Sequence, residues 1–173
     1  MIQLLNFISV DECDVLIAGI KAAETKTSGT HYWDGMMTYP ENITDQVIVD
    51  KMDNVTMQLL KETKIRNEIK RPLYRDSMMF GTWREGKDMP VHTDNQVLPG
   101  QESISTPWRD FTSILYLNDN YEGGELILPE SNLIIKPTKG EALLLGTGEP
   151  HGVSKITSGI RYTLISWFSA LNK

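Results

Sequence analysis

The stretch of sequence that decides the fold is Ile160-Arg161-Tyr162-Thr163-Leu164-Ile165-Ser166-Trp167-Phe168, near the end of a chain of 173 residues. Branched and aromatic side chains dominate it, and these favour β-strands. Alternate residues of a strand face opposite sides, so Arg161, Thr163 and Trp167 would share one face. Burying an unpaired charge is costly, so Arg161 in this apolar strand predicts a partner or a ligand for its guanidinium.

Short strand-like segments continue this pattern back to residue 73. Clusters of glycine and proline, such as Gly123-Gly124, mark the turns between them. The candidate strands are 73–84, 89–94, 111–118, 124–129, 132–136, 141–147, 151–155 and 160–169. Such a series predicts an all-β sandwich or barrel, and we expect a jelly-roll closure with helices packed on one outer face.

Two amphipathic helices are expected before the strands. Ser9 and Glu12 form a capping-box pattern at the start of the first helix, and Asp45 can cap the second. Apolar residues then recur at helical spacing in both segments. They are Val10, Cys13, Ile17 and Ile20 in the first helix, and Ile48, Met52, Val55 and Leu59 in the second. We expect a single domain over residues 1–173, with a helical part at 1–70 and a jelly-roll core at 71–173.

The composition is ordinary for a globular protein, at 40% hydrophobic and 23% charged residues. A net charge of -6 argues against broad nucleic-acid binding, which needs a positive surface. The single Cys13 excludes an intrachain disulfide, and no apolar segment approaches the roughly 20 residues of a membrane span. The first residues lack the basic region of a signal peptide. We therefore expect a cytoplasmic protein with no membrane segment, and the sequence predicts no particular oligomeric state.

A His-x-Asp pair and a distant histidine form the candidate metal site. His92 and Asp94 are two residues apart on an expected strand, so both would face one side. His151, between Pro150 and Gly152, is the candidate third ligand. Two imidazoles and one carboxylate form the triad of non-haem Fe(II) oxygenases, which leaves coordination positions open. The sequence therefore predicts a catalytic Fe(II) site at His92, Asp94 and His151.

Arg161 follows the last histidine by ten residues and has two interpretations. It could pair with an internal carboxylate, for which Glu125 and Glu141 are candidates. Alternatively, it is a fixed cation for a ligand, because guanidinium binds carboxylates in a bidentate fork. A cupin-like metal-binding module without oxygenase activity would not need such an anchor.

Over roughly residues 74–169 the chain resembles the Fe(II)/2-oxoglutarate-dependent dioxygenases, and within them the prolyl 4-hydroxylase-like branch, whose core is a double-stranded β-helix. Beyond the triad and Arg161, the likeness rests on three segments. These are Ile114 to Asn118 followed by Gly123-Gly124-Glu125-Leu126, then Lys139 to Leu145, and finally the closing strand with Arg161-Tyr162 and Trp167.

The resemblance implies a co-substrate site and an activity. Arg161 would bind the distal carboxylate of 2-oxoglutarate, and Tyr116 would offer its hydroxyl unless it is only a core tyrosine. The branch often has a tyrosine where this chain has Thr82 and Trp83, and a hydroxyl where it has Ile165. Thr163, on the face of Arg161, could compensate. The implied enzyme uses Fe(II), 2-oxoglutarate and O2, with ascorbate as a candidate additional cofactor, to hydroxylate an unactivated C–H bond with release of succinate and CO2.

A proline within a peptide is the first expectation for the substrate. Another protein side chain, a free amino acid or another small molecule are the alternatives. A nucleobase is disfavoured as the substrate, because the branch of nucleobase demethylases has a second arginine where this chain has Trp167. Candidate substrate contacts are Trp108 and Arg109, within the polar stretch 95–110, and Tyr32 and Trp33, in an aromatic loop. The aromatic residues could equally anchor these loops to the core.

Overall fold

The computed structural model describes residues 1–23, 36–95 and 106–170. Two of the candidate substrate contacts, Tyr32 and Trp33, lie outside these ranges. The elements in chain order are β1 (Ile2–Leu4), α1 (Val10–Ala23), β2 (Met37–Thr38), the 3-10 helix η2 (Pro40–Asn42), α2 (Gln46–Arg66), β3 (Tyr74–Arg84), β4 (Met89–His92), β5 (Phe111–Tyr116), β6 (Glu122–Gly123), β7 (Leu126–Leu128), β8 (Leu133–Ile135), β9 (Ala142–Gly146), β10 (His151–Val153), β11 (Ile156–Ser158) and β12 (Ile160–Ser169).

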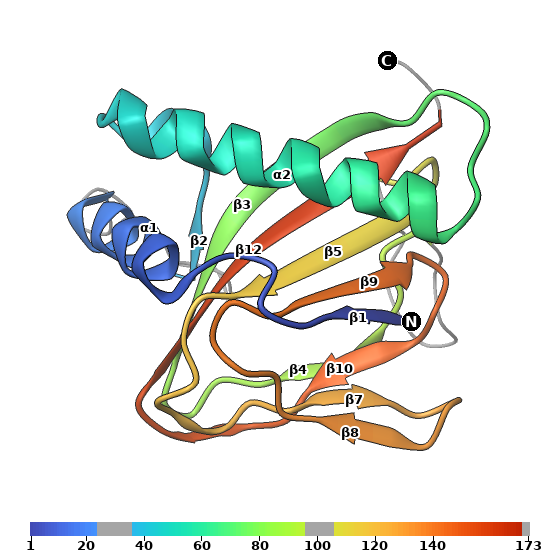
Figure 1. Cartoon of the computed structure of the whole chain (residues 1–173). Helices are drawn as coiled ribbons and strands as arrows, with labels where there is room; N and C mark the ends of the chain where they lie inside the picture. The colour runs from blue at the N-terminus through green and yellow to red at the C-terminus, as the bar shows by residue number, and fades with distance from the viewer. Residues whose placement is uncertain (24–35, 96–105, 171–173) are drawn as a thin grey trace.

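Two antiparallel sheets face one another, and both helices cover the outer face of the larger sheet (Figure 1). The larger sheet has the strand order β1-β9-β5-β12-β3-β2, and the smaller one has the order β4-β10-β7-β8. The short β11 and β6 form a separate pair. The crossing connections between the two sheets are those of a jelly roll, so the predicted fold class is confirmed.

Strand β12 is central in the larger sheet. It pairs with β3 on one side and β5 on the other, with Thr163 opposite Gly81 and Tyr116. Leu164 and Phe168 pack into the core beneath the helices, whereas Ile165 packs into the cluster between the sheets. The predicted alternation of faces is therefore present.

The helix caps form as predicted. The Ser9 backbone N–H donates to the Glu12 carboxylate at 3.0 Å, and the Glu12 N–H donates to the Ser9 hydroxyl at 3.3 Å. Asp45 accepts the Val47 N–H at 2.9 Å. These bonds satisfy donors that a helix start leaves without partners.

The apolar stripe of α2 is buried as predicted, but that of α1 is rotated. The buried residues of α1 are Cys13, Leu16, Gly19, Ile20 and Ala23. Val10, at the first position of the helix, is 56% exposed. The buried face therefore runs through Cys13, Leu16 and Ile20, with Ile17 only partly buried at its border.

The sequence patterns missed four short strands, namely β1, β2, β6 and β11. β1 shows why, because its three residues carry too little periodicity to be read. Tertiary contacts hold it instead: Gln3 pairs with Leu143 of β9, and the Gln3 amide donates to the buried Glu141 carboxylate. The N-terminal segment thus extends the larger sheet.

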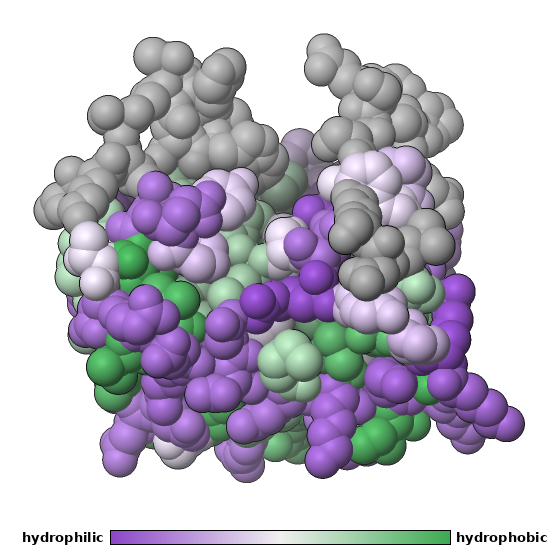
Figure 2. Space-filling view, turned by 90° about the horizontal axis from the view of Figure 1, so that it is seen from above, coloured by the Kyte–Doolittle hydropathy of each residue, from purple (hydrophilic) through white to green (hydrophobic). Residues whose placement is uncertain are grey.

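Among the described residues, no helix is both long and apolar enough to cross a bilayer. Seen from above, the described surface alternates hydrophilic side chains with smaller hydrophobic groups (Figure 2). Val47, Met57 and Ile65 of α2 are among the large apolar side chains exposed to solvent. Scattered single residues of this kind are normal on a water-exposed surface.

Candidate metal centre and co-substrate pocket

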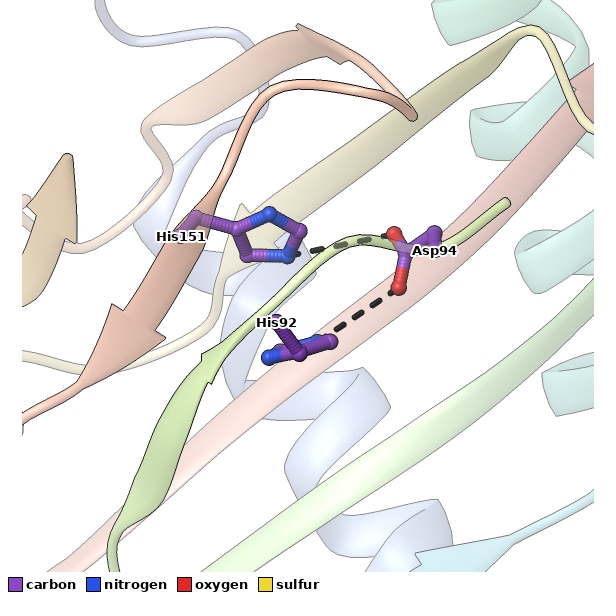
Figure 3. A group of neighbouring side chains, drawn as sticks. All are labelled: His92, Asp94 and His151. Carbon is purple, nitrogen blue, oxygen red and sulfur yellow. Dashed lines mark ion pairs between the residues drawn. The ribbon is translucent and has the colours of Figure 1, made fainter. Parts of the chain in front are cut away.

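The three predicted metal ligands come together at one end of the smaller sheet (Figure 3). His92 ends β4 and His151 begins β10, and the two residues are register partners in this antiparallel pair. Asp94 lies two residues beyond His92. One potential ligand atom from each of the three residues lies within 4.8 Å of the others.

Asp94 reaches the site by a different route from the expected one. The ladder of β4 ends at His92, so Asp94 is not a strand residue. Its backbone N–H instead donates to the Thr147 carbonyl at 2.8 Å, and its carbonyl accepts the Thr106 hydroxyl at 3.0 Å. These two hydrogen bonds hold the backbone of Asp94 in place beyond the end of strand β4.

The side-chain geometry suits a facial set of ligands. The Nε2 atom of His92 lies 3.5 Å from Oδ1 of Asp94, and Nε2 of His151 lies 3.8 Å from Oδ2. The two imidazole centroids are 4.4 Å apart, with the ring planes tilted by 50°. Both Nε2 atoms and the carboxylate therefore converge on one point, while the opposite side carries no ligand from these residues.

Backbone carbonyls select the tautomer of both histidines. His92 Nδ1 lies 3.0 Å from the Pro90 carbonyl oxygen, and His151 Nδ1 lies 2.9 Å from that of Glu149. A carbonyl oxygen can only accept, so each Nδ1 carries the proton and each Nε2 presents its lone pair. This arrangement is typical of metal-binding histidines.

Charge coupling acts on all three pKa values. Burial raises the pKa of Asp94, but the hydrogen bond from His92 and the charge of His151 outweigh it, so the pKa of Asp94 lies far below its usual value. Burial lowers the pKa of His92, yet Asp94 raises it overall. For His151 burial dominates and the pKa falls. An ionised carboxylate beside a neutral His151 is the charge state that a divalent metal requires.

Arg161 is buried between the two sheets, with 2% of its surface exposed. Its guanidinium donates to the Tyr116 hydroxyl at 3.2 Å and lies 4.9 Å from the centre of that ring. The Nε atom of Arg161 and the hydroxyl of Thr163 are buried and have no hydrogen-bond partner among the described residues. Two buried donors on one face of β12 thus lack an acceptor among the described residues.

The two glutamates that could have neutralised Arg161 are engaged elsewhere. Glu141 accepts from Gln3 and from the Thr138 backbone N–H, and Glu125 accepts the Ser154 hydroxyl. Within the described ranges, Arg161 forms no ion pair with a carboxylate. The internal ion pair considered from the sequence is therefore absent there, which favours the ligand interpretation.

Two residues beside Arg161 were not among the predicted co-substrate contacts. Trp83 is the register partner of Arg161, whose guanidinium lies 5.4 Å from the centre of the indole ring. Tyr121 is also nearby, and burial raises the pKa of its hydroxyl to about 12 despite the Arg161 charge. The alternation of β3 could have suggested Trp83, but Tyr121 lies in a loop and carries no periodic signal.

The Gly123-Gly124 motif has a steric explanation. Both glycines have positive φ angles, of 72° and 69°, which other residues rarely adopt. A Cβ atom on Gly124 would lie 2.3 Å from Ile156 Cδ1 and 3.1 Å from Arg161 Cδ. The motif therefore leaves room for the stem of Arg161.

The predicted substrate contacts Trp108 and Arg109 have intramolecular partners. The Trp108 indole N–H donates to Asp76 at 2.9 Å, and Arg109 Nε donates to the other oxygen of Asp76 at 2.8 Å. The Arg109 guanidinium stacks 4.1 Å from the centre of the Trp167 ring. Their role in substrate binding stays a prediction.

Comparison with known proteins agrees with this geometry. Residues 78–169 match the family model of the 2OG-Fe(II) oxygenase superfamily. Human prolyl 3-hydroxylase 2 is 34% identical over an alignment of 93 residues, and the match covers 46% of this chain and 13% of that protein. The chain thus spans about an eighth of the length of this curated relative.

Solved structures share the fold over nearly the whole chain. The collagen prolyl hydroxylase of Paramecium Bursaria Chlorella virus-1, in complex with 2OG, superimposes with a TM-score of 0.71 at 22% identity, covering 99% of this chain and 96% of that one. The prolyl hydroxylase of Trichoplax adhaerens, solved with a hypoxia inducible factor peptide fragment, has a TM-score of 0.71 at 16% identity, covering 98% and 83%. The family match extends over more than half of the chain and includes the triad and Arg161, so the chain belongs to the 2OG-Fe(II) oxygenase superfamily, within which it is similar to the prolyl hydroxylases.

Proposed function

We propose that this protein is an Fe(II)- and 2-oxoglutarate-dependent hydroxylase, and that its substrate is a proline within a peptide. One observation carries the first part. Arg161 has a buried guanidinium without a carboxylate partner among the described residues. It lies on the same face of β12 as Trp167, whose indole N–H donates to Asp94 at 3.0 Å. Arg161, which could bind a carboxylate, and the triad, which could bind a metal, therefore lie in the same space between the sheets.

The triad fits Fe(II). Its donor set is two neutral imidazole Nε2 atoms and one carboxylate, which is the set that non-haem iron oxygenases use. Both Nδ1 atoms already donate to backbone carbonyls, so the ligand atoms need no rearrangement. His92, Asp94 and His151 would hold the metal.

The pocket fits the distal carboxylate of 2-oxoglutarate. Arg161 Nε and the Thr163 hydroxyl are buried donors without acceptors among the described residues, and the Tyr116 hydroxyl lies beside them. A carboxylate would satisfy these donors together, because its two oxygens offer about four acceptor positions. Arg161, Thr163 and Tyr116 would hold this end of the co-substrate.

The protein itself would orient the co-substrate in an apolar interior. Arg161 would fix the acid at one end, so that its other end lies toward the triad. The apolar cluster of Leu126, Leu128, Leu143 and Leu145 packs between the sheets and gives this interior an apolar lining. Bound iron and 2-oxoglutarate would supply the oxygen activation that C–H hydroxylation requires.

A peptidyl proline is the proposed substrate because of the relatives. Human prolyl 3-hydroxylase 2 and the viral collagen prolyl hydroxylase both carry this activity in their names. The Trichoplax enzyme was solved with a peptide fragment. Whether C3 or C4 of the proline is attacked would depend on how the peptide lies over the triad. Another side chain or a small molecule is the alternative substrate.

Anaerobic titration of Fe(II) and 2-oxoglutarate into the apo protein tests the site. A chelated 2-oxo acid on Fe(II) gives a visible charge-transfer band, which we expect for the wild type. The His92→Ala variant should lack the band, since its side chain is partly exposed and contributes a ligand rather than core packing. A folded wild-type protein that binds metal without the band would favour a cupin-like binding module instead.

Incubation with proline-containing peptides tests the substrate. Succinate should form in step with a peptide product heavier by one oxygen atom, and fragmentation would locate the oxygen on proline. Succinate formation that no proline peptide stimulates would direct the search to other side chains and to small molecules.

A further inference from the structure

The carboxylate of Asp94 is held from behind by two side chains on the larger sheet. Thr112 of β5 donates its hydroxyl to Oδ2 at 2.5 Å, and Trp167 of β12 donates its indole N–H to the same oxygen at 3.0 Å. A carboxylate oxygen has two lone pairs, so these bonds occupy both on Oδ2. The other oxygen, Oδ1, is the one nearer to His92, at 3.5 Å.

A second layer holds Trp167 in place. The Arg109 guanidinium stacks on the indole ring at 4.1 Å, and it is itself fixed by Asp76 at 2.8 Å and the Ser77 hydroxyl at 2.9 Å. Asp76 also accepts the Trp108 indole N–H. Arg109 therefore has less freedom than a surface arginine, and the indole cannot tilt without breaking this stack.

The backbone of Arg109 also connects the two segments that carry the ligands. Its carbonyl oxygen accepts the Asn95 amide at 2.9 Å and the Thr147 hydroxyl at 2.6 Å. Asn95 directly follows Asp94, and Thr147 precedes His151 by four residues. One residue thus supports the ligands through both its side chain and its main chain.

We propose that Trp167 and Thr112 are positioning residues that make Asp94 a monodentate ligand through Oδ1, with Arg109 and Asp76 holding the indole of Trp167. This inference rests on the proposed function. A carboxylate that could turn would bind through both oxygens and occupy a further coordination position. The triad must leave positions open for a chelating 2-oxo acid and for O2. The hydrogen bonds on Oδ2 would therefore protect the open positions rather than the metal affinity alone.

The test compares Thr112→Val, Trp167→Phe and their double variant with the wild type. Valine keeps the shape of threonine, and phenylalanine keeps a ring for Arg109 to stack on. The matched control is Thr56→Val, which removes a buried hydroxyl bonded to Ser166 at 3.1 Å on the opposite face of β12. The readouts are Co(II) affinity and absorption spectrum, the anaerobic Fe(II)–2-oxoglutarate band, and the thermal unfolding midpoint of each apo protein.

We expect the double variant still to bind metal, while its affinity for 2-oxoglutarate falls by about 10-fold or more, comparable to the loss of activity when groups that support metal ligands are removed. The Co(II) spectrum and the Fe(II)–2-oxoglutarate band should change in the double variant, whereas Thr112→Ser, which keeps the hydroxyl, should show the wild-type band. Thr56→Val should lower the unfolding midpoint without changing either spectrum. Unchanged spectra and 2-oxoglutarate affinity in the folded double variant would overturn the proposal. Absence of the band in the wild type would contradict the proposed function instead.

Arg109 gives an independent check, because it is also a candidate substrate contact. If it acts through Trp167, Arg109→Met alters the Fe(II)–2-oxoglutarate band when no substrate is present. A band that is normal without peptide and altered only with it would assign Arg109 to the substrate and remove it from the proposed support of Asp94.

Discussion

The two faces of β12 differ in kind although they belong to one strand. On the side of the helices, Leu164 and Phe168 are fully buried in a continuous apolar core. On the side between the sheets, Arg161 and Thr163 are equally buried but present donors without acceptors among the described residues. The first face is complete in the protein alone, whereas the second becomes complete only with a ligand. Stability and binding should therefore respond separately to changes on the two faces.

The largest effect is expected on the helix side. Phe168→Ala removes a fully buried ring and should lower the free energy of unfolding by about 3–5 kcal/mol, because it leaves a cavity. Chemical denaturation measures this change. The fraction that stays folded in the cold should bind 2-oxoglutarate with wild-type affinity, and a parallel loss of affinity would show that the two faces are not separable.

The next effect is expected at Arg161. Arg161→Met keeps much of the side-chain volume but removes the charge, and should weaken 2-oxoglutarate binding by about 2–5 kcal/mol, as for loss of one partner of a buried charge pair. Calorimetric titration of the Fe(II) protein measures it. The unfolding midpoint of the apo protein should not fall, since a buried charge without an opposite partner is removed. A marked fall would mean that Arg161 mainly supports the fold.

The pH dependence should separate the two histidines. His151 should lose its proton below the usual histidine pKa, because burial lowers its pKa, and His92 above it, because Asp94 raises its pKa. Metal binding needs both rings neutral, so affinity should fall as the pH drops through the pKa of His92, by about 1.4 kcal/mol per pH unit. NMR titration of the apo protein shows which histidine has the lower pKa. A lower pKa for His92 than for His151 would contradict the coupling of His92 to Asp94.

The smallest effect is expected for Thr163→Val. It removes one hydroxyl from the pocket and should weaken 2-oxoglutarate binding by about 0.5–1.5 kcal/mol, the usual net worth of a hydrogen bond. The same calorimetric titration measures it, with Thr56→Val as the matched change on the other face. Equal affinity in the two variants would exclude Thr163 from the co-substrate site.

Much of this arrangement could be predicted from the sequence because the signals were local. The alternation in 160–168 predicted the two faces of β12, and the His-x-Asp spacing predicted two neighbouring ligands. The charge of Arg161 in an apolar strand predicted either an internal partner or a ligand. Each of these inferences depends on residues that are close in sequence, where strand geometry alone decides what they share.

The parts that could not be predicted depend on contacts between distant segments. Tyr121 lies beside Arg161 because a loop returns there, and β1 joins the sheet through Gln3 and Glu141. The stack of Arg109 on Trp167 joins residues that are far apart in the sequence, so no spacing reveals it. Asp94 also lies beyond the strand from which its direction was inferred.

The pairing of His92 with His151 has a mechanical consequence. β4 is an edge strand of four residues, and within the described part of the chain its register partners lie only on β10. An ion bound by both histidines would cross-link the two strands and close a long chain loop, much as a disulfide does. Amide hydrogens of β4 should therefore exchange slowly in the metal-loaded protein and quickly without metal. The bound cation would thus stabilise the pairing of β4 at the edge of the smaller sheet.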